Sequence, residues 1–134
     1  MNNATKNNAV TPTLSLEQKR AKDAWDKSKN YDKDHINFAK GVPALIMNSG
    51  LLQVLAFCQE KEKQQKLVAD DLCQWLATQF EWVAKYQGIE DFIGKLITAS
   101  PSDYQAITTE AFAWLRWLRQ MAGARKANLK KGEA

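Results

Sequence analysis

KGVPALIMNSGLLQVLAFCQE, residues 40–60, is the stretch of sequence that decides the fold. If residues 51–58 wind as a helix, most of its surface is apolar, because Leu52 and Phe57 widen the main apolar face on both flanks. A helix that is apolar nearly all round is covered by other helices on most sides. This segment is therefore predicted to be the central helix of the domain.

Two residues in the same stretch break helices. Pro43 lacks the N–H that would bond the carbonyl four residues earlier, so a helix kinks or restarts there. Gly50 follows Asn48-Ser49 and suits a left-handed position just past a helix end. We therefore predict a helix, a break at Pro43, a short helix, a break at Gly50 and then the central helix.

The rest of the chain carries helical patterns and none of the alternation typical of strands. Ser15 and Gln18 form a capping box that opens a helix to about Asn30, with Trp25 on its apolar face. Ser100 is the predicted N-cap of the last helix. The other helices are predicted near residues 34–40, 65–85 and 89–97. The fold class is all-α, a compact bundle of five to seven helices.

Length and composition predict a single helical domain over residues 1–134, with a flexible leader at 1–13 and a basic tail at about 125–134. Hydrophobic content is 45% with five tryptophans, which suffices for a core. No apolar run approaches the length of a membrane span and no signal segment follows Met1, so a cytoplasmic protein is expected. Cys58 and Cys73 are expected to be buried thiols.

The sequence offers little for catalysis. His35 is the only histidine and lies at a predicted helix start, and the acidic pairs are neighbours that point about 100° apart on a helix. There is no phosphate-binding glycine loop, no zinc motif and no nucleophile motif. We therefore expect no enzyme, no cofactor, no metal and no small-molecule substrate.

Charge is unevenly distributed along the chain, whose net charge is +4. The ends are basic and the middle is acidic, a pattern that suits a polyanion at one surface and a protein partner at another. An acidic stripe is predicted opposite the apolar face of residues 65–85, and its members could dock on a neighbour together with an exposed Trp117. The predicted interface residues are Asp70, Asp71, Gln74, Glu81 and Trp117.

The last helix carries the candidate nucleic-acid contacts. If it continues past Gly123, then Arg116, Arg119, Lys126 and Lys130 share one face. Such a row is either a solvated helix face whose last cations complement the dipole, or a set of phosphate contacts.

Two stretches resemble a known family. KGVPALIMNSGLLQVLAF, residues 40–57, is similar to the signature of the small subunit of the type III-B CRISPR effector, the Cmr complex. YQAITTEAFAWLRWLRQMA, residues 104–122, resembles its closing helix, and EQKRAKDAW at 17–25 fits more loosely. The resemblance spans most of residues 16–122.

The resemblance implies a non-catalytic helical bundle that works in antiviral defence. Copies of the family's small subunit line up beside larger subunits that hold the guide RNA, and together they form the groove for a target RNA. Cleavage belongs to other subunits. The implied partners are further Cmr subunits, copies of the chain itself, the guide RNA and the target RNA, with no membrane.

The sequence departs from the family at two positions, since Met47 and Gln105 stand where basic residues are common. The candidate RNA contacts are therefore Lys40, Arg116, Arg119, Lys126, Lys130 and Arg20. The alternative is a helical adaptor that binds only protein, but it would have no need of six cations within the last 25 residues.

Overall fold

The computed structural model describes residues 13–61 and 63–133, with side chains up to Ala127. Its elements in chain order are α1 (Leu16–Lys27), the 3₁₀ turn η1 (Ser28–Asn30), α2 (Lys33–Glu60), α3 (Gln64–Gln79), the 3₁₀ turn η2 (Glu81–Val83), α4 (Gly88–Ile97) and α5 (Pro101–Glu133). The part of the chain described contains no strand, so the all-α prediction is confirmed. The predicted leader lies outside these residues except for Thr13.

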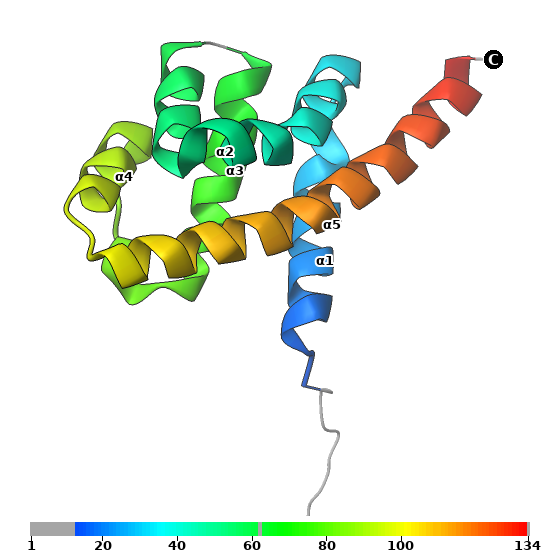
Figure 1. The fold of residues 1–134 in the computed structure, drawn as a ribbon. Helices are drawn as coiled ribbons and strands as arrows, with labels where there is room; N and C mark the ends of the chain where they lie inside the picture. Colours follow the sequence, from blue (N-terminus) through cyan, green and yellow to red (C-terminus); the bar gives the residue numbers. More distant parts are fainter. Residues whose placement is uncertain (1–12, 62, 134) are drawn as a thin grey trace, which may run out of the picture.

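α5 is the longest helix and runs across the whole molecule, with α1 crossing it and the other helices gathered along it (Figure 1). It contacts α1, α2 and α3, while α4 packs on α2 and α3. The buried apolar residues of α5 lie along one face of the helix, between Ile107 and Ala122. They are Ile107, Ala111, Trp114, Leu115, Leu118 and Ala122.

The predicted helix starts are confirmed. Ser15 and Gln18 form a reciprocal capping box at α1. At α2, Asp32 is the cap, and its carboxylate accepts from the backbone N–H of His35 at 2.9 Å. At α5, the Ser100 hydroxyl accepts from the N–H of Asp103 at 3.1 Å. Each cap satisfies a backbone donor that would otherwise lack a partner.

α2 is one helix interrupted only once. The predicted break at Pro43 is wrong, because the backbone stays helical through this residue. Burial of Val42 and Ile46 on either side outweighs the hydrogen bond that proline loses, a case of packing overriding propensity. The predicted break at Gly50 is confirmed, with φ 83° and ψ 157°. These angles are more extended than the left-handed helical region and are essentially restricted to glycine.

By length and composition alone, α2 could pass for a membrane span, with a mean hydropathy of 1.6 over its most apolar window. The expectation that no such run exists was therefore wrong. The finding does not indicate a membrane protein, because α2 is the core helix of the domain. Its buried side chains on both sides of the Gly50 break, such as Ile46 and Leu51, pack among the other helices.

One helix boundary and the burial of one tryptophan differ from the prediction. α3 ends at Gln79, where Phe80 adopts an extended conformation, so residues 81–83 form η2 and do not continue the face of α3. Trp25 is 39% exposed, and Ala24 and Ser28 are the buried residues at this end of α1. The two cysteines are free and buried as predicted, and burial raises the pKa of Cys58 to about 12.

Candidate nucleic-acid interface

α5 continues past Gly123, so the condition for a row of cations along it is met. Arg116 and Arg119 are exposed and Lys126 is half-buried. The side chain of Lys130, the fourth predicted member, lies outside the described residues. The helix therefore brings three of the predicted cations onto one face.

Lys40 of α2 completes this row. Gly123 lies on the same face of α5, seven residues after Arg116 and three before Lys126, and has no side chain to contribute. The Lys40 stem occupies that place, since its Cε lies 3.8 Å from where a β-carbon on Gly123 would be. We call Arg116, Arg119, Lys40 and Lys126 the cationic row.

Few neighbouring carboxylates neutralise the positive charge of the cationic row. Lys126 Nζ donates to the amide oxygen of Asn37 at 2.7 Å, a neutral partner that positions the ammonium without cancelling its charge. Arg119 and Lys40 make no hydrogen bond or ion pair with any described residue. Arg116 lies close enough to Glu17 to contribute to the lowered pKa of that carboxyl, after hydrogen bonds from Arg20 and Trp117. The exposed cations are thus available to an external anion.

Arg20, also predicted as an RNA contact, is instead engaged within the protein. Its Nε and Nη2 donate to both carboxylate oxygens of Glu110, at 2.8 and 2.7 Å, and Glu110 also accepts from the Trp75 indole at 2.9 Å. The Arg20 side chain is only 15% exposed. A buried carboxylate needs a bidentate cation and further donors, and Arg20 fills this role between α1, α3 and α5.

The acidic stripe does not form one exposed face. Asp71 is only 8% exposed and accepts a hydrogen bond from the Tyr31 hydroxyl at 2.8 Å. Burial raises the pKa of Asp71 to about 6. Asp70 is half-buried and Gln74 exposed, while Glu81 is exposed in η2, beyond the end of α3.

Trp117 lies elsewhere than predicted. Its indole N–H donates to Glu17 of α1 at 3.1 Å, which turns this half-buried ring toward α1. Phe112, the aromatic beside the cationic row, is also half-buried and packs against the core. Both aromatics therefore serve the helix contacts of α5.

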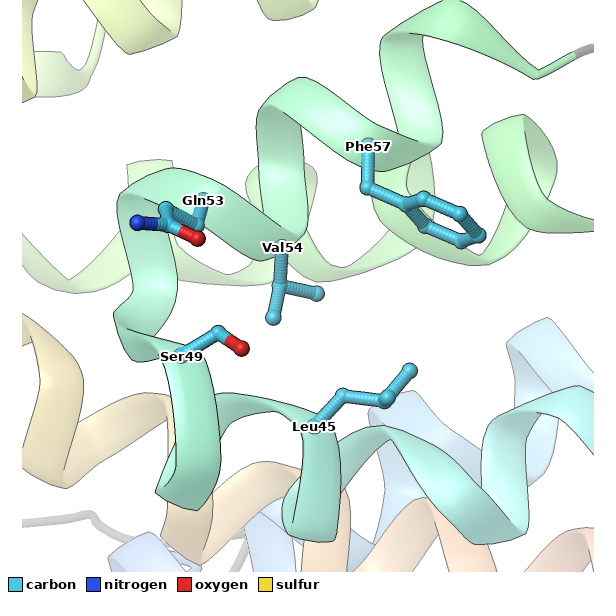
Figure 2. Close-up of a pocket in the computed structure, with 5 residues that line it drawn as sticks. All are labelled: Leu45, Ser49, Gln53, Val54 and Phe57. Atoms are coloured by element: carbon cyan, nitrogen blue, oxygen red, sulfur yellow. The ribbon is translucent and has the colours of Figure 1, made fainter.

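An apolar groove lies at the bend of α2 (Figure 2). Leu45 and Ser49 line it before Gly50, and Gln53, Val54 and Phe57 line it after Gly50, around a volume of about 210 Å³. Leu45 and Phe57 are 39% and 41% exposed. Among the described residues, no three His, Cys, Asp or Glu side chains could hold a metal ion. His35 instead pairs with Asp32 at 2.7 Å.

The fold and this surface define a small all-α protein that presents cations from two helices along its longest helix. Residues 16–125 match the model of the family described as CRISPR-associated protein (Cas_Cmr5). The chain therefore belongs to the Cmr5 family, and it is a small subunit of the Cmr complex of type III-B CRISPR systems.

The crystal structure of a CRISPR-associated Cmr5 family protein from Thermus thermophilus has a similar fold. It aligns with a TM-score of 0.67 at 23% sequence identity, covering 83% of this chain and 97% of that one. No curated protein matches the chain. The family consists of small structural subunits, which is consistent with the prediction of no catalysis.

Proposed function

We propose that the chain is a non-catalytic subunit that packs beside the guide-RNA backbone of a cytoplasmic Cmr complex and holds the target RNA through the cationic row. One observation carries the proposal: Lys40 reaches over Gly123, so that cations from α2 and α5 form a continuous line. Lys130 remains a proposed further contact one turn beyond Lys126.

The geometry of the row suits a phosphate backbone. From Arg116 to Lys126 the helix rises about 15 Å, at 1.5 Å per residue, and neighbouring positions on the row are about one turn apart. Contacts of this kind position a strand and read no bases, as a subunit that accepts any guide and target sequence requires. A few such cations bind weakly, roughly 10⁻⁴–10⁻⁶ M at physiological salt, so the assembled complex is the relevant binding species.

The test changes Arg116, Arg119, Lys40 and Lys126 to Ala and measures the target affinity of the assembled complex against salt. Binding should weaken for every target sequence, and the slope of log K against log salt should flatten by up to about 3, since each lost contact with a single strand removes about 0.7. A matched control changes four exposed lysines elsewhere, Lys19, Lys29, Lys66 and Lys85.

Only the variant of the row should lose slope if the row binds phosphate. An unchanged slope, with the target RNA still protected in the complex, would contradict RNA contact. That result would favour the alternative, a helical adaptor that binds only protein. The apolar groove at the α2 bend is the feature that supports this second candidate.

Docking on neighbouring subunits, including further copies of the chain, is proposed for the exposed acidic residues. Asp70, Gln74 and Glu81 remain candidates, whereas Asp71 is buried and Trp117 faces α1. Reversing Asp70 and Glu81 to Lys should lower incorporation into the complex while the thermal unfolding of the free chain changes little. Normal incorporation of this variant would exclude these two carboxylates.

A further inference from the structure

We infer that Arg125 is a positioning residue for the cationic row: it anchors the end of α5 to α1 and so holds Lys126 beside Lys40. In this role it makes no phosphate contact itself, although it is a cation at the same end of the helix. The inference rests on the proposed RNA-binding function, since it assigns a task within the same site.

The guanidinium of Arg125 makes three contacts within the protein. Its Cζ lies 3.7 Å from the centroid of the Trp25 ring, so one face of the group is stacked on the indole. Nε and Nη2 both donate to the backbone carbonyl of Trp25, at 3.2 and 2.7 Å, and Nε also donates to the Ser28 hydroxyl at 3.1 Å. Stacking and forked donation together are an arrangement that lysine cannot reproduce.

The C-terminal end of α1 is a suitable anchor. The last carbonyls of a helix have no partners within it and form the negative end of its dipole. Arg125 supplies two donors and a positive charge to one of these carbonyls from a helix 100 residues away in sequence. Ser28 is fully buried, and its hydroxyl bonds the same Trp25 carbonyl at 3.2 Å, which holds both acceptors in place.

The end of α5 has little else to hold it. Ala122 is the last buried residue of α5 among those whose side chains are described, and Ala124 and Ala127 are exposed. Gly123 weakens the helix at this point by about 1 kcal/mol relative to alanine. Apolar packing of α5 therefore ends at Ala122, four residues before Lys126, the last member of the cationic row.

Arg125 and Lys126 divide two tasks between adjacent positions. Neighbouring residues on a helix point about 100° apart, so Arg125 turns to α1 while Lys126 turns to α2. Among the residues whose side chains are described, the Lys126 ammonium there hydrogen-bonds only the Asn37 amide oxygen, at 2.7 Å. Without the anchor, this single neutral hydrogen bond would have to keep the end of α5 alongside Lys40.

The experiment measures target-RNA affinity against salt for the assembled complex carrying Lys126→Ala, Arg125→Ala or Trp25→Leu. Each variant should lower the salt slope by about 0.7, the loss of one contact with a single strand. Trp25→Leu is the decisive variant, because it removes no charge. The double change of Arg125 and Lys126 to Ala should lower the slope no further than Lys126→Ala alone.

Arg125→Lys is the matched control for charge. If Arg125 is a positioning residue, Arg125→Lys should behave as Arg125→Ala does. If Arg125 contacts phosphate, Arg125→Lys should keep the wild-type salt slope. A loss of about 1.4 in the double variant, the sum of two independent contacts, would likewise overturn the inference. All variants should retain the wild-type helical content.

Amide hydrogen exchange tests the anchor without RNA. Exchange of residues 123–127 should become faster in Arg125→Ala and Trp25→Leu, and should not change in Arg119→Ala. Unchanged exchange would overturn the inference even if the row binds RNA. If exchange becomes faster but no cation of the row affects the salt slope, the proposed RNA contact is wrong. Arg125 would then only stabilise the contact between α1 and α5.

Discussion

α1 and α5 are joined largely by directional contacts, whereas α2 and α3 are joined by apolar side chains. Along α5, Glu110 binds Arg20, and the indoles of Trp114 and Trp117 donate to carboxylates of α1. Between α2 and α3 the packing leaves a space of only about 10 Å³. The lining is entirely apolar: Phe38, Val42, Val54, Leu55, Cys58, Val68, Ala69 and Leu72.

The difference concerns how each contact fails. Apolar packing has no preferred partner, so its loss scales with the area and cavity that a change leaves behind. A buried carboxylate requires its particular donors, and removing one side leaves an uncompensated charge or donor in the interior. The α1–α5 contact therefore fixes one relative placement of these helices, and α5 carries three of the four residues of the cationic row.

The largest expected effect comes from breaking the α1–α5 contact at Glu110. Glu110→Ala leaves the Arg20 guanidinium and the Trp75 indole N–H without their shared acceptor, both largely buried. We expect a loss of about 4 kcal/mol in the free energy of unfolding, measured by urea denaturation.

The matched control is the exposed ion pair of Lys22 and Asp26, which also belongs to α1. Lys22→Ala should leave the midpoint of urea denaturation almost unchanged, because solvent screens this pair. Similar shifts of the midpoint for both variants would show that burial does not distinguish the two pairs.

A smaller effect is expected at the bend of α2, where the cost of a substitution depends on the backbone conformation and not on the loss of a partner. Gly50→Ala should cost about 2 kcal/mol in the free energy of unfolding, because an L-residue is strained at φ 83°. The new methyl group would meet only the Tyr104 hydroxyl, at an ordinary 3.5 Å.

Gly41→Ala on the same helix is the control. Its backbone is helical, and apart from the adjacent residues and the helix's own backbone nothing lies within 4 Å of the added carbon. Gly41→Ala should therefore stabilise the protein by up to about 1 kcal/mol. Equal effects of the two substitutions in thermal unfolding would remove the argument from strain.

The smallest effect is expected at Asp71, a polar group held within α3. Burial raises the pKa of Asp71 to about 6, although the Tyr31 hydrogen bond and the charge of Lys27 oppose this, while Asp70 and Asp23 reinforce it. Between about pH 4 and 6 the folded protein binds more protons than the unfolded chain, so this group lowers stability as pH rises through the window.

Asp71→Asn keeps an acceptor for the Tyr31 hydroxyl and removes the buried charge. It should raise the free energy of unfolding at pH 7 by about 1 kcal/mol and flatten the pH dependence between pH 4 and 6. The check is thermal unfolding across this range, with Asp70→Asn as the neighbouring control. A destabilised variant with an unchanged pH profile would mean that Asp71 is ionised at little cost.

Features that depend on near neighbours were predictable from the sequence. The caps at Ser15 and Ser100 and the break at Gly50 each follow from a few adjacent residues. The face of α5 that is buried follows from helical spacing. Lys40 and the α5 cations were each candidates. Their alignment depends on Gly123, which has no side chain and so leaves room for the Lys40 stem. Only the packing of α2 against α5 reveals this alignment.

Features that depend on distant partners were not predictable. Arg20 is read as a free cation and Asp71 as a surface carboxylate because their partners, Glu110 and Tyr31, lie 90 and 40 residues away. Trp25 is half-exposed for a similar reason, since it stacks with Arg125 rather than entering the core. Pro43 shows the opposite error, because a strong local rule yields to burial on both sides.

The partnership of Arg20 with Glu110 also has a consequence for synthesis on the ribosome. α1 leaves the ribosome before α5, and the buried partner of Arg20 follows 90 residues later. At about 5–20 residues per second, α1 spends roughly 5–20 s without the helix that completes it. Its surface suits this delay, since only Ala24 of α1 is buried in the finished fold. The nascent N-terminal helix thus exposes mostly charged side chains to chaperones and neighbouring chains until α5 emerges.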